Sequence, residues 1–284
     1  MPESSSFGSA VEATAPPTRE PGAELLPGYV VTGVLGVGRR VETYEVYSPL
    51  RDAACVVRIL RSDLSQDQAA RDLVVLEGTL LKELTHPHLA RGYELAYTPV
   101  PAMVVEMATG TTLAIRTVES PLEPELVAEA GVRIASALGY LHRQGWLHLD
   151  VTPSGILVGA DRVLLTDLGL LGRTGALGTT ASPRRGGYAA PEQLRDEELV
   201  PETDVWGLAA TMAYALTGRA PFGDDPSWET DGSRLLPRPR QGRQGPELAG
   251  VPPRWRELLE QALCTAPVER PSMTELRNRL RELT

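Results

Sequence analysis

After residue 27 short apolar-rich runs of β-type residues alternate with polar turn residues, which predicts β-strands. Turn residues separate these runs, so they indicate an antiparallel meander. Apolar residues at helical spacing then predict a helix over Ala69–Leu84, which His86-Pro87 ends. The predicted strands are Tyr29–Val34, Glu42–Tyr47, Ala54–Leu60, Ala90–Ala96 and Ala102–Met107.

Beyond Gly110 the period becomes that of helices. Pro124–Gln144 is amphipathic, begins with a proline and stops at Gly145. Two short strand-like runs follow, at Ile156–Val158 and Val163–Thr166. A mostly β region therefore precedes a mostly α region, and we find no internal repeat. The remaining helices are predicted at Asp204–Leu216, Pro253–Leu263 and Met273–Leu283.

Two segments show no periodicity. Residues 1–27 are rich in Ser, Pro, Glu and Ala, which predicts a disordered tail. Residues 227–250 are rich in Pro, Gly and Arg and predict an irregular surface loop. This loop is a candidate docking site for an acidic partner, with an ordinary solvated loop as the alternative. Its arginines are Arg234, Arg238, Arg240 and Arg243.

Composition narrows the function. The formal net charge of the 284 residues is −9, which argues against broad nucleic-acid binding. Cys55 and Cys264 have no neighbour at metal-ligand or redox-pair spacing, so we expect apolar thiols in a reducing compartment. No apolar run approaches the ~20 residues of a membrane span. No secretory signal is visible either, and a cytoplasmic protein is expected.

A series of short motifs then runs along the chain, and its order and spacing are far more specific than any single member. The motifs are Leu35-Gly36-Val37-Gly38, Val56-Val57-Arg58, Glu77, His86-Pro87, Val104-Val105-Glu106-Met107, His148-Leu149-Asp150, Asp167-Leu168-Gly169, Ala190-Pro191-Glu192, Asp204-Val205-Trp206-Gly207 and Arg270-Pro271. From about Gly28 to Thr284 the chain thereby resembles a bacterial, eukaryotic-like serine/threonine protein kinase domain. The resemblance implies an α+β, bilobal fold. A β-rich N-lobe with one main helix (28–108) would face a mostly helical C-lobe (109–284) across an ATP-binding cleft.

The resemblance also assigns chemical roles. Asp150 matches the catalytic aspartate that orients the substrate hydroxyl, and Asp167 matches the aspartate that ligates Mg²⁺. Glu77 matches the helix glutamate that pairs with the phosphate-binding lysine. Asp150 and Asp167 have an alternative role as structural hydrogen-bond acceptors. The nucleotide-binding positions are Gly36, Gly38, Val41, Thr43, Val56, Arg58, Val105, Glu106, Met107 and Leu157.

The positions that handle phosphate and metal depart from the family pattern. Arg58 replaces the phosphate-binding lysine, and its broad guanidinium is not equivalent to a compact ammonium. Lys82, the only lysine in the chain, is predicted to face away from Glu77 on the same helix. Thr152 replaces a second lysine, and Gly155 replaces the asparagine that holds the second Mg²⁺. Together these losses predict a turnover slower by many orders of magnitude, since each 1.36 kcal/mol is about tenfold in rate.

The adenine pocket is altered too. Val41 replaces the third glycine of the phosphate loop, Val56 replaces the alanine beneath the adenine, and Thr43 replaces a valine. Leu157, the floor of the pocket, is intact, and the gatekeeper Val105 is small. Two extra carbons in a tight slot cost about 1–3 kcal/mol, so ATP binding is expected to be weakened or lost.

The loop between Asp167 and Glu192 departs as well. Leu149 replaces the arginine that reads a phosphorylated activation loop, which predicts that this switch is absent. Arg185 stands where a threonine is usual and is expected to pair with Asp150. Candidate phosphoacceptors for a partner kinase lie near Arg173, Arg184 and Arg185, with an ordinary polar loop as the alternative. They are Thr174, Thr179, Thr180 and Ser182.

The architectural positions, in contrast, are kept. Glu192 and Arg270 match the buried ion pair of the large lobe, and Asp204 matches the residue that braces the catalytic loop. Three layers of the apolar column that joins the lobes are present, and the fourth position is Gly92, which predicts an incomplete column. The three layers are Leu81, His148 and Leu168.

The architectural positions of the kinase domain are kept, whereas the positions that bind phosphate, metal and adenine are altered. This combination favours a pseudokinase that scaffolds or allosterically regulates a protein partner, such as an active kinase. Two alternatives stay open. One is an atypical but active Ser/Thr kinase that uses Arg58 for the phosphates and one metal ion at Asp167. The other is a sensor that binds ATP without transferring phosphate.

Overall fold

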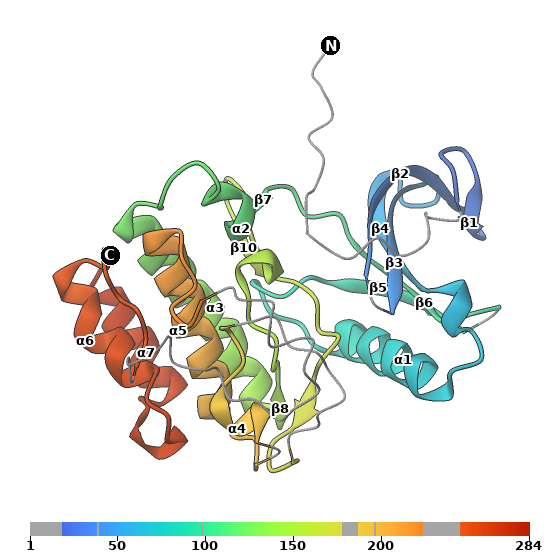
Figure 1. The fold of residues 1–284 in the computed structure, drawn as a ribbon. Helices are drawn as coiled ribbons and strands as arrows, with labels where there is room; N and C mark the ends of the chain where they lie inside the picture. Colours follow the sequence, from blue (N-terminus) through green and yellow to red (C-terminus); the bar gives the residue numbers. More distant parts are fainter. Residues whose placement is uncertain (1–18, 39, 98, 178–186, 196, 224–244) are drawn as a thin grey trace. The chain divides into compact units, whose positions relative to one another are not determined.

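The N-terminal strands form one antiparallel sheet of six strands in the order β1-β2-β3-β4-β6-β5. The computed structural model describes residues 19–38, 40–97, 99–177, 187–195, 197–223 and 245–284. The sheet is visible in blue and cyan in Figure 1. Its strands are β1 (Glu24–Leu26), β2 (Tyr29–Val37), β3 (Val41–Ser48), β4 (Ala53–Leu60), β5 (Gly92–Ala96) and β6 (Ala102–Glu106).

Strand β1 lies within the segment predicted to be a disordered tail, so that prediction was wrong for Glu24–Leu26. Glu24 pairs with Val30 and Leu26 with Tyr29. Leu26 is buried in a core cluster with Tyr29 and Val31. Three residues before a proline are too few to show a period of two, and this apolar contact is what holds them in the sheet. Residues 1–18 lie outside the described part of the chain.

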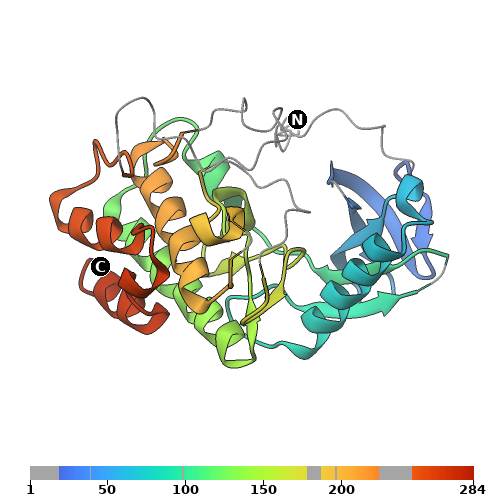
Figure 2. The ribbon, with the colours of Figure 1, turned by 60° about the horizontal axis from the view of Figure 1, so that its bottom comes forward.

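Helix α1 (Gln68–Glu83) packs against β5 and β6. Figure 2 shows it running along one face of the sheet. The side chain of Asp67 accepts a hydrogen bond from the amide of Ala70 at 3.0 Å and so caps the helix. Along β4, Cys55 and Val57 point into the core cluster on one face. Alternation places Val56 and Arg58 on the other face.

The chain divides into two units. The sheet unit comprises the described residues up to 85 together with 89–108, and the helical unit comprises 86–88 and 109–284. In the helical unit α3 packs against α5 and α7, and α5 packs against α6. These helices are α3 (Pro124–Arg143), α5 (Pro201–Thr217), α6 (Pro253–Ala262) and α7 (Met273–Arg281). A β-rich unit with one long helix and a mostly helical unit confirm the predicted fold class.

The helical unit also contains two small sheets of short strands. A three-stranded sheet has the order β10-β9-β7, and a two-stranded sheet joins β11 to β8. Short helical segments lie beside them, namely α2 (Leu113–Arg116), η2 (Pro153–Gly155) and α4 (Pro191–Leu194). The strands are β7 (Thr111–Thr112), β8 (Trp146–Leu147), β9 (Ile156–Val158), β10 (Val163–Leu165) and β11 (Gly172–Arg173). Among the residues described, no helix combines the length and apolarity needed to cross a membrane.

The segment His86–His88 belongs to the helical unit, although the chain on both sides of it belongs to the sheet unit. His88 Nδ1 donates to the carbonyl of Val163 at 2.9 Å. His86 Nδ1 accepts from the amide of His88 at 3.1 Å, so the neutral ring carries its proton on Nε2, which lies 3.3 Å from Ser136 Oγ. His86 also stacks on Tyr140. The segment is therefore held through neutral imidazoles.

Acid is expected to destabilise this attachment. Burial lowers the pKa of His86 below 6.5, and the charges of His88 and Arg143 lower it further. Burial also lowers the pKa of His88; the Val163 carbonyl opposes this, and Arg133 and Arg162 add to it. A depressed pKa gives stability that is complete above pH 6.5 and is lost as pH falls through the folded-state pKa.

The measurement is the melting temperature between pH 8 and pH 5. We expect it to fall by several degrees more in the native chain than in the double variant His86→Asn, His88→Asn. Equal slopes for the two proteins would contradict this assignment.

Candidate functional site

The predicted nucleotide-binding residues of the sheet unit gather on one face of three neighbouring strands. Thr43 on β3 pairs with Arg58 on β4, and Val56 on β4 pairs with Val105 on β6. Because side chains alternate along a strand, these four residues and Val41 share the face that carries Arg58. The register thus brings together the adenine, gatekeeper and phosphate positions of this unit.

The glycine loop is a tight hairpin. Gly36 still pairs with Thr43 inside the ladder, and the amide of Gly38 donates to the carbonyl of Val41 at 2.8 Å. Val41 is 7% exposed and pairs with Leu60 as a regular residue of β3. A buried, branched side chain therefore stands where the family has a glycine. The predicted crowding of a bound phosphate by Val41 stays a prediction.

Arg58 forms an ion pair with Glu77 of α1. Arg58 Nη1 donates to Glu77 Oε1, and the two side chains are only 15% and 4% exposed. Lys82 is exposed while Glu77 is buried, so the only lysine does not share the position of Glu77 on the helix. The strand-to-helix pair of a kinase is thus formed with arginine in place of lysine.

The end of β6 is tied to the residue that precedes β5. The amide of Glu106 donates to the carbonyl of Arg91 at 2.9 Å, and Glu106 Oε1 accepts from the amide of Arg91 at 2.9 Å. Met107 follows the strand and is half-buried. No contact of Met107 or of Glu106 tests their predicted role in binding a nucleotide, so that role stays a prediction.

In the helical unit, Asp204 fixes the loop that carries Asp150. Its carboxylate accepts from the amides of His148 and Leu149, both at 2.8 Å, and from His142 Nε2 at 2.7 Å. Burial raises the pKa of Asp204, but the hydrogen bond and charge of His142 and the contacts to His148 lower it more, so the net pKa lies below 3.8. These bonds hold Leu149 at a φ of 65°, which is rare for a residue with a side chain.

Two further braces of this loop were not found from the sequence. Gln193 Nε2 donates to the carbonyl of Leu149 at 3.0 Å, and its Oε1 accepts from the amide of Ala190. Thr211 of α5 donates to the carbonyl of Val151 at 3.1 Å and is fully buried. Both residues lie just after motifs, but a single sequence gives no signal for side-chain bonds to a distant backbone.

Gly155 and Thr152 lie at the end of the same loop. A Cβ at Gly155 would be 3.5 Å from Thr152 Oγ1, 3.7 Å from the Thr166 carbonyl and 3.9 Å from the Asp150 carbonyl, which are ordinary contacts. A Cβ at residue 155 is therefore sterically acceptable. Leu157 on β9 pairs with Leu164 and Thr112, which keeps an apolar position in this unit.

The metal positions fit one ion better than two. Asp167 has a φ of 64°, and its Oδ1 accepts from the amide of Gly169 at 3.3 Å. Mg²⁺ is often held by one or two carboxylates together with phosphate oxygens, a role that Asp167 can fill for one ion. Gly155 offers no side-chain oxygen for a second. Among the residues described, no group of three or more His, Cys, Asp or Glu is arranged to hold a metal.

The start of the activation segment is held by packing. The side chain of Leu149 lies against Gly172, where an added Cβ would be 2.7 Å from Leu149 Cδ1. The Arg173 guanidinium lies over the Trp146 ring at 3.7 Å, and β11 pairs with β8. Thr174 is exposed. Arg184, Arg185, Thr179, Thr180 and Ser182, like the arginines of the 227–250 loop, lie outside the described residues, so those predictions stay untested.

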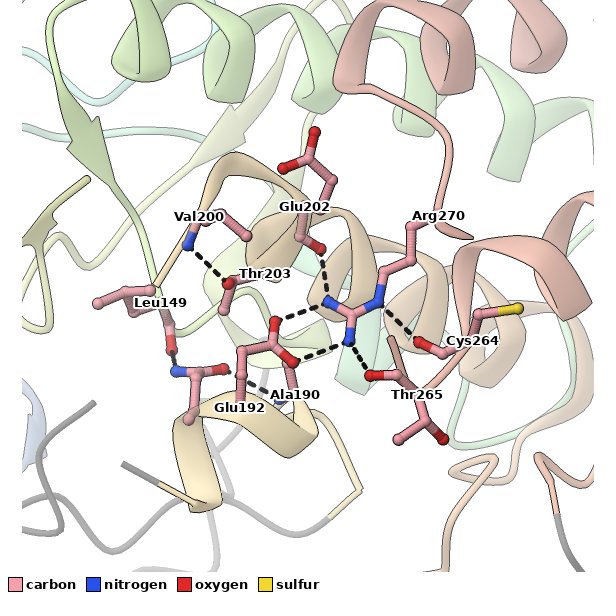
Figure 3. A network of polar contacts seen from close by, with 10 residues as sticks. Leu149, Ala190, Glu192, Val200, Glu202, Thr203, Cys264, Thr265 and Arg270 are labelled. Atoms are coloured by element: carbon pink, nitrogen blue, oxygen red, sulfur yellow. Dashed lines mark hydrogen bonds and ion pairs between the residues drawn. The ribbon is translucent and has the colours of Figure 1, made fainter. Parts of the chain in front are cut away.

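Arg270 and Glu192 form the buried ion pair that the sequence predicts (Figure 3). Arg270 Nη1 and Nη2 donate to the two oxygens of Glu192 at 2.7 and 2.8 Å. The remaining donors reach the carbonyls of Glu202, Thr265 and Cys264 at 2.9, 3.1 and 2.8 Å. All five N–H groups of the guanidinium are satisfied. The pair therefore ties α4, the start of α5 and the segment before α7 into one network.

The three predicted apolar layers are buried in their own units. Leu81 is 4% exposed, His148 0% and Leu168 2%. His148 Nδ1 accepts from the amide of Asp150 at 3.3 Å. In the described chain the other ring nitrogen of His148 has no hydrogen-bond partner. The backbone of Leu81 lies directly against Gly92 in the sheet unit, and the predicted incomplete column stays a prediction.

Comparison with known proteins agrees with these observations. The family model of the protein kinase domain matches residues 29–280. The chain therefore belongs to the protein kinase domain family.

Individual relatives are bacterial serine/threonine kinases. The chain is 30% identical over 272 residues to the serine/threonine-protein kinase PkaB of Streptomyces coelicolor, covering 90% of this chain and 63% of that protein. It is 29% identical over 258 residues to PknF of Mycobacterium tuberculosis, covering 86% of this chain and 53% of that protein. The chain thus spans between about half and two thirds of the length of these relatives.

A solved structure shares the fold. The crystal structure of the Mycobacterium tuberculosis PknI kinase domain matches with a TM-score of 0.73 at 24% identity, over 94% of this chain and 100% of that one.

Proposed function

We propose that this chain is a pseudokinase domain that acts by binding a protein partner, as a scaffold or allosteric regulator in signalling, with weak or absent ATP turnover. The observation that carries the proposal is the absence of a side chain at Gly155, in a loop whose backbone is held by hydrogen bonds with three buried side chains. Asp204, Gln193 and Thr211 hold that loop in place. The frame for catalysis is kept while a metal ligand is missing.

The cationic positions support the same proposal. Arg58 is committed to Glu77 in a mostly buried ion pair. A guanidinium is broad and planar, and it does not reproduce the compact charge of lysine at a phosphate. Thr152 brings a hydroxyl that lies 3.3 Å from Ser154 Oγ, and it brings no charge. Phosphoryl transfer depends almost entirely on positioning and charge stabilisation, so these changes remove much of what accelerates it.

Two carboxylates of the family's catalytic machinery, Asp150 and Asp167, are present. Asp150 is placed to orient a hydroxyl, because its loop is fixed by the buried carboxylate of Asp204. Asp167 supplies one carboxylate, and one bound Mg²⁺ would neutralise phosphate charge there. Val41 and Val56 narrow the face on which adenine and phosphates would lie. These residues together favour weak nucleotide binding and phosphate transfer that is slower than in an ordinary kinase.

The second candidate function is a nucleotide sensor, which the formed Arg58–Glu77 pair favours. That pair keeps a cation at the phosphate position. A third candidate, an atypical active Ser/Thr kinase, would use the same cation with one metal ion at Asp167. The relatives are named as serine/threonine-protein kinases, which supports this third candidate.

A thermal-shift titration with ATP, with and without Mg²⁺, beside a radiolabel transfer assay separates the three functions. The scaffold gives neither a shift of melting temperature nor transfer. The sensor gives a shift without transfer. Transfer that disappears in Asp150→Asn identifies the active kinase and overturns the proposal.

A further inference from the structure

Strand β5 and helix α1 of the sheet unit touch through backbone. A Cβ placed on Gly92 of β5 would lie 2.7 Å from the carbonyl carbon of Leu81, 2.8 Å from its Cβ and 2.9 Å from its carbonyl oxygen. These distances are well inside van der Waals contact, since carbon atoms pack best at about 3.5–4.0 Å. The main chain of the helix therefore occupies the space that any side chain at residue 92 would need.

A second glycine stands on the helix and faces the sheet. A Cβ on Gly78 would lie 2.6 Å from Leu95 Cδ1 and 3.3 Å from Met103 Cβ. Leu95 and Met103 are paired neighbours on β5 and β6. Gly78 directly follows Glu77, the partner of Arg58. The helix has a glycine, Gly78, where the sheet approaches it, and the sheet has a glycine, Gly92, where the helix approaches it. The two contact positions on the helix, Gly78 and Leu81, are about one helical turn apart.

This close approach determines where Glu77 lies. In protein kinases the lysine–glutamate pair must be in place, and the position of this helix is a point of control. Here the backbone of Leu81 contacts Gly92 of the strand, and Gly78 contacts the side chains of Leu95 and Met103. Glu77 directly precedes Gly78 on this helix, so the contacts at Gly78 and Leu81 fix the position from which it reaches Arg58.

We propose that the Gly92–Leu81 and Gly78–Leu95 contacts lock α1 against the sheet, so that the Arg58–Glu77 pair stays formed whatever the chain binds. The helix is then a fixed element of a rigid sheet unit and no longer a switch. The lock, and not the ion pair, holds the helix. This inference goes beyond the proposed function and does not depend on whether the chain turns over ATP.

Hydrogen exchange of the α1 amides, followed by mass spectrometry on the full chain, tests the lock. Gly92→Ala is expected to speed exchange across Gln68–Glu83 by about tenfold or more, because the helix must move off the strand. Gly33→Ala is the matched control, since a Cβ at that position of the sheet meets only Glu45, at 3.5 and 3.8 Å. Its α1 exchange should equal that of the native chain.

A double variant separates the lock from the ion pair. Arg58→Met with Glu77→Leu removes both charges and leaves neither partner buried alone. We expect α1 to keep its protection in this protein. Loss of protection here, or unchanged protection in Gly92→Ala, would overturn the proposal.

Gly78→Ala is a second test, for use if Gly92→Ala does not fold. The lock predicts that it destabilises the chain, whereas replacing glycine by alanine inside a helix normally stabilises the helix. Here we expect faster α1 exchange and a lower melting temperature, because the new methyl must displace Leu95. A higher melting temperature with slower exchange would contradict the lock.

Discussion

The triple variant Arg58→Lys, Thr152→Lys, Gly155→Asn is expected to transfer phosphate at least about 10²-fold faster than the native chain. A hydrogen bond to a charged group contributes about 1.5–3 kcal/mol, and each 1.36 kcal/mol is about tenfold in rate. The structure permits the key change, since a Cβ at residue 155 meets nothing closer than 3.5 Å. A lysine at residue 58 still reaches Glu77 as a compact charge. The measurement is the initial rate of γ-phosphate transfer to a generic acceptor protein.

Two controls make this result specific. Replacing Gly155→Asn by Gly155→Ala in the same background adds the Cβ without a metal ligand and should return the rate close to that of the double variant. Adding Asp150→Asn should abolish the gain. A triple variant as inactive as the native chain would mean that the missing groups do not explain the loss of turnover.

Arg270→Met is expected to lower the free energy of unfolding of the helical unit by about 3–5 kcal/mol, because it leaves the carboxylate of Glu192 buried without its partner. Glu192 is 1% exposed, and the variant also removes the hydrogen bonds that the guanidinium donates to three carbonyls. All four tryptophans of the chain lie within residues 109–284, so their fluorescence during urea denaturation reports this unit.

Arg279→Met is the matched control on α7. The pair of Arg279 with Glu257 is 3.8 Å long, and Glu257 is 92% exposed. An exposed pair is worth about 0–1 kcal/mol, so this variant should unfold close to the native midpoint. Similar losses for the two arginines would show that the Glu192–Arg270 network does not hold the unit together.

The sequence predicted the long elements well because their periodicity is strong. The predicted helix Pro124–Gln144 is observed as Pro124–Arg143, and Ala69–Leu84 as Gln68–Glu83. Helix α5 begins at Pro201, three residues before the predicted start, because a proline suits the first turn and Thr203 bonds back to the amide of Val200. Short elements such as β1, β8 and β11 have too few residues to show a period.

The site was predicted by motif order, which identifies residues but not their contacts. The motifs gave Asp204, Glu192 and Arg270 in their observed roles. They could not reveal Gln193 and Thr211, whose bonds to backbone carbonyls depend on tertiary approach. They also could not reveal that the backbone of Leu81 lies directly against Gly92. A missing side chain is visible in a sequence, whereas the helix backbone that fills its place is not.

The most direct test of the account compares γ-phosphate transfer by the native chain and by Asp150→Asn, with Mg²⁺ and ATP in excess. The account predicts equal signals at the level of the protein-free blank, both for labelling of the chain itself and for a generic substrate. Transfer by the native chain near the ordinary kinase range of about 1–100 s⁻¹, abolished in Asp150→Asn, would contradict it.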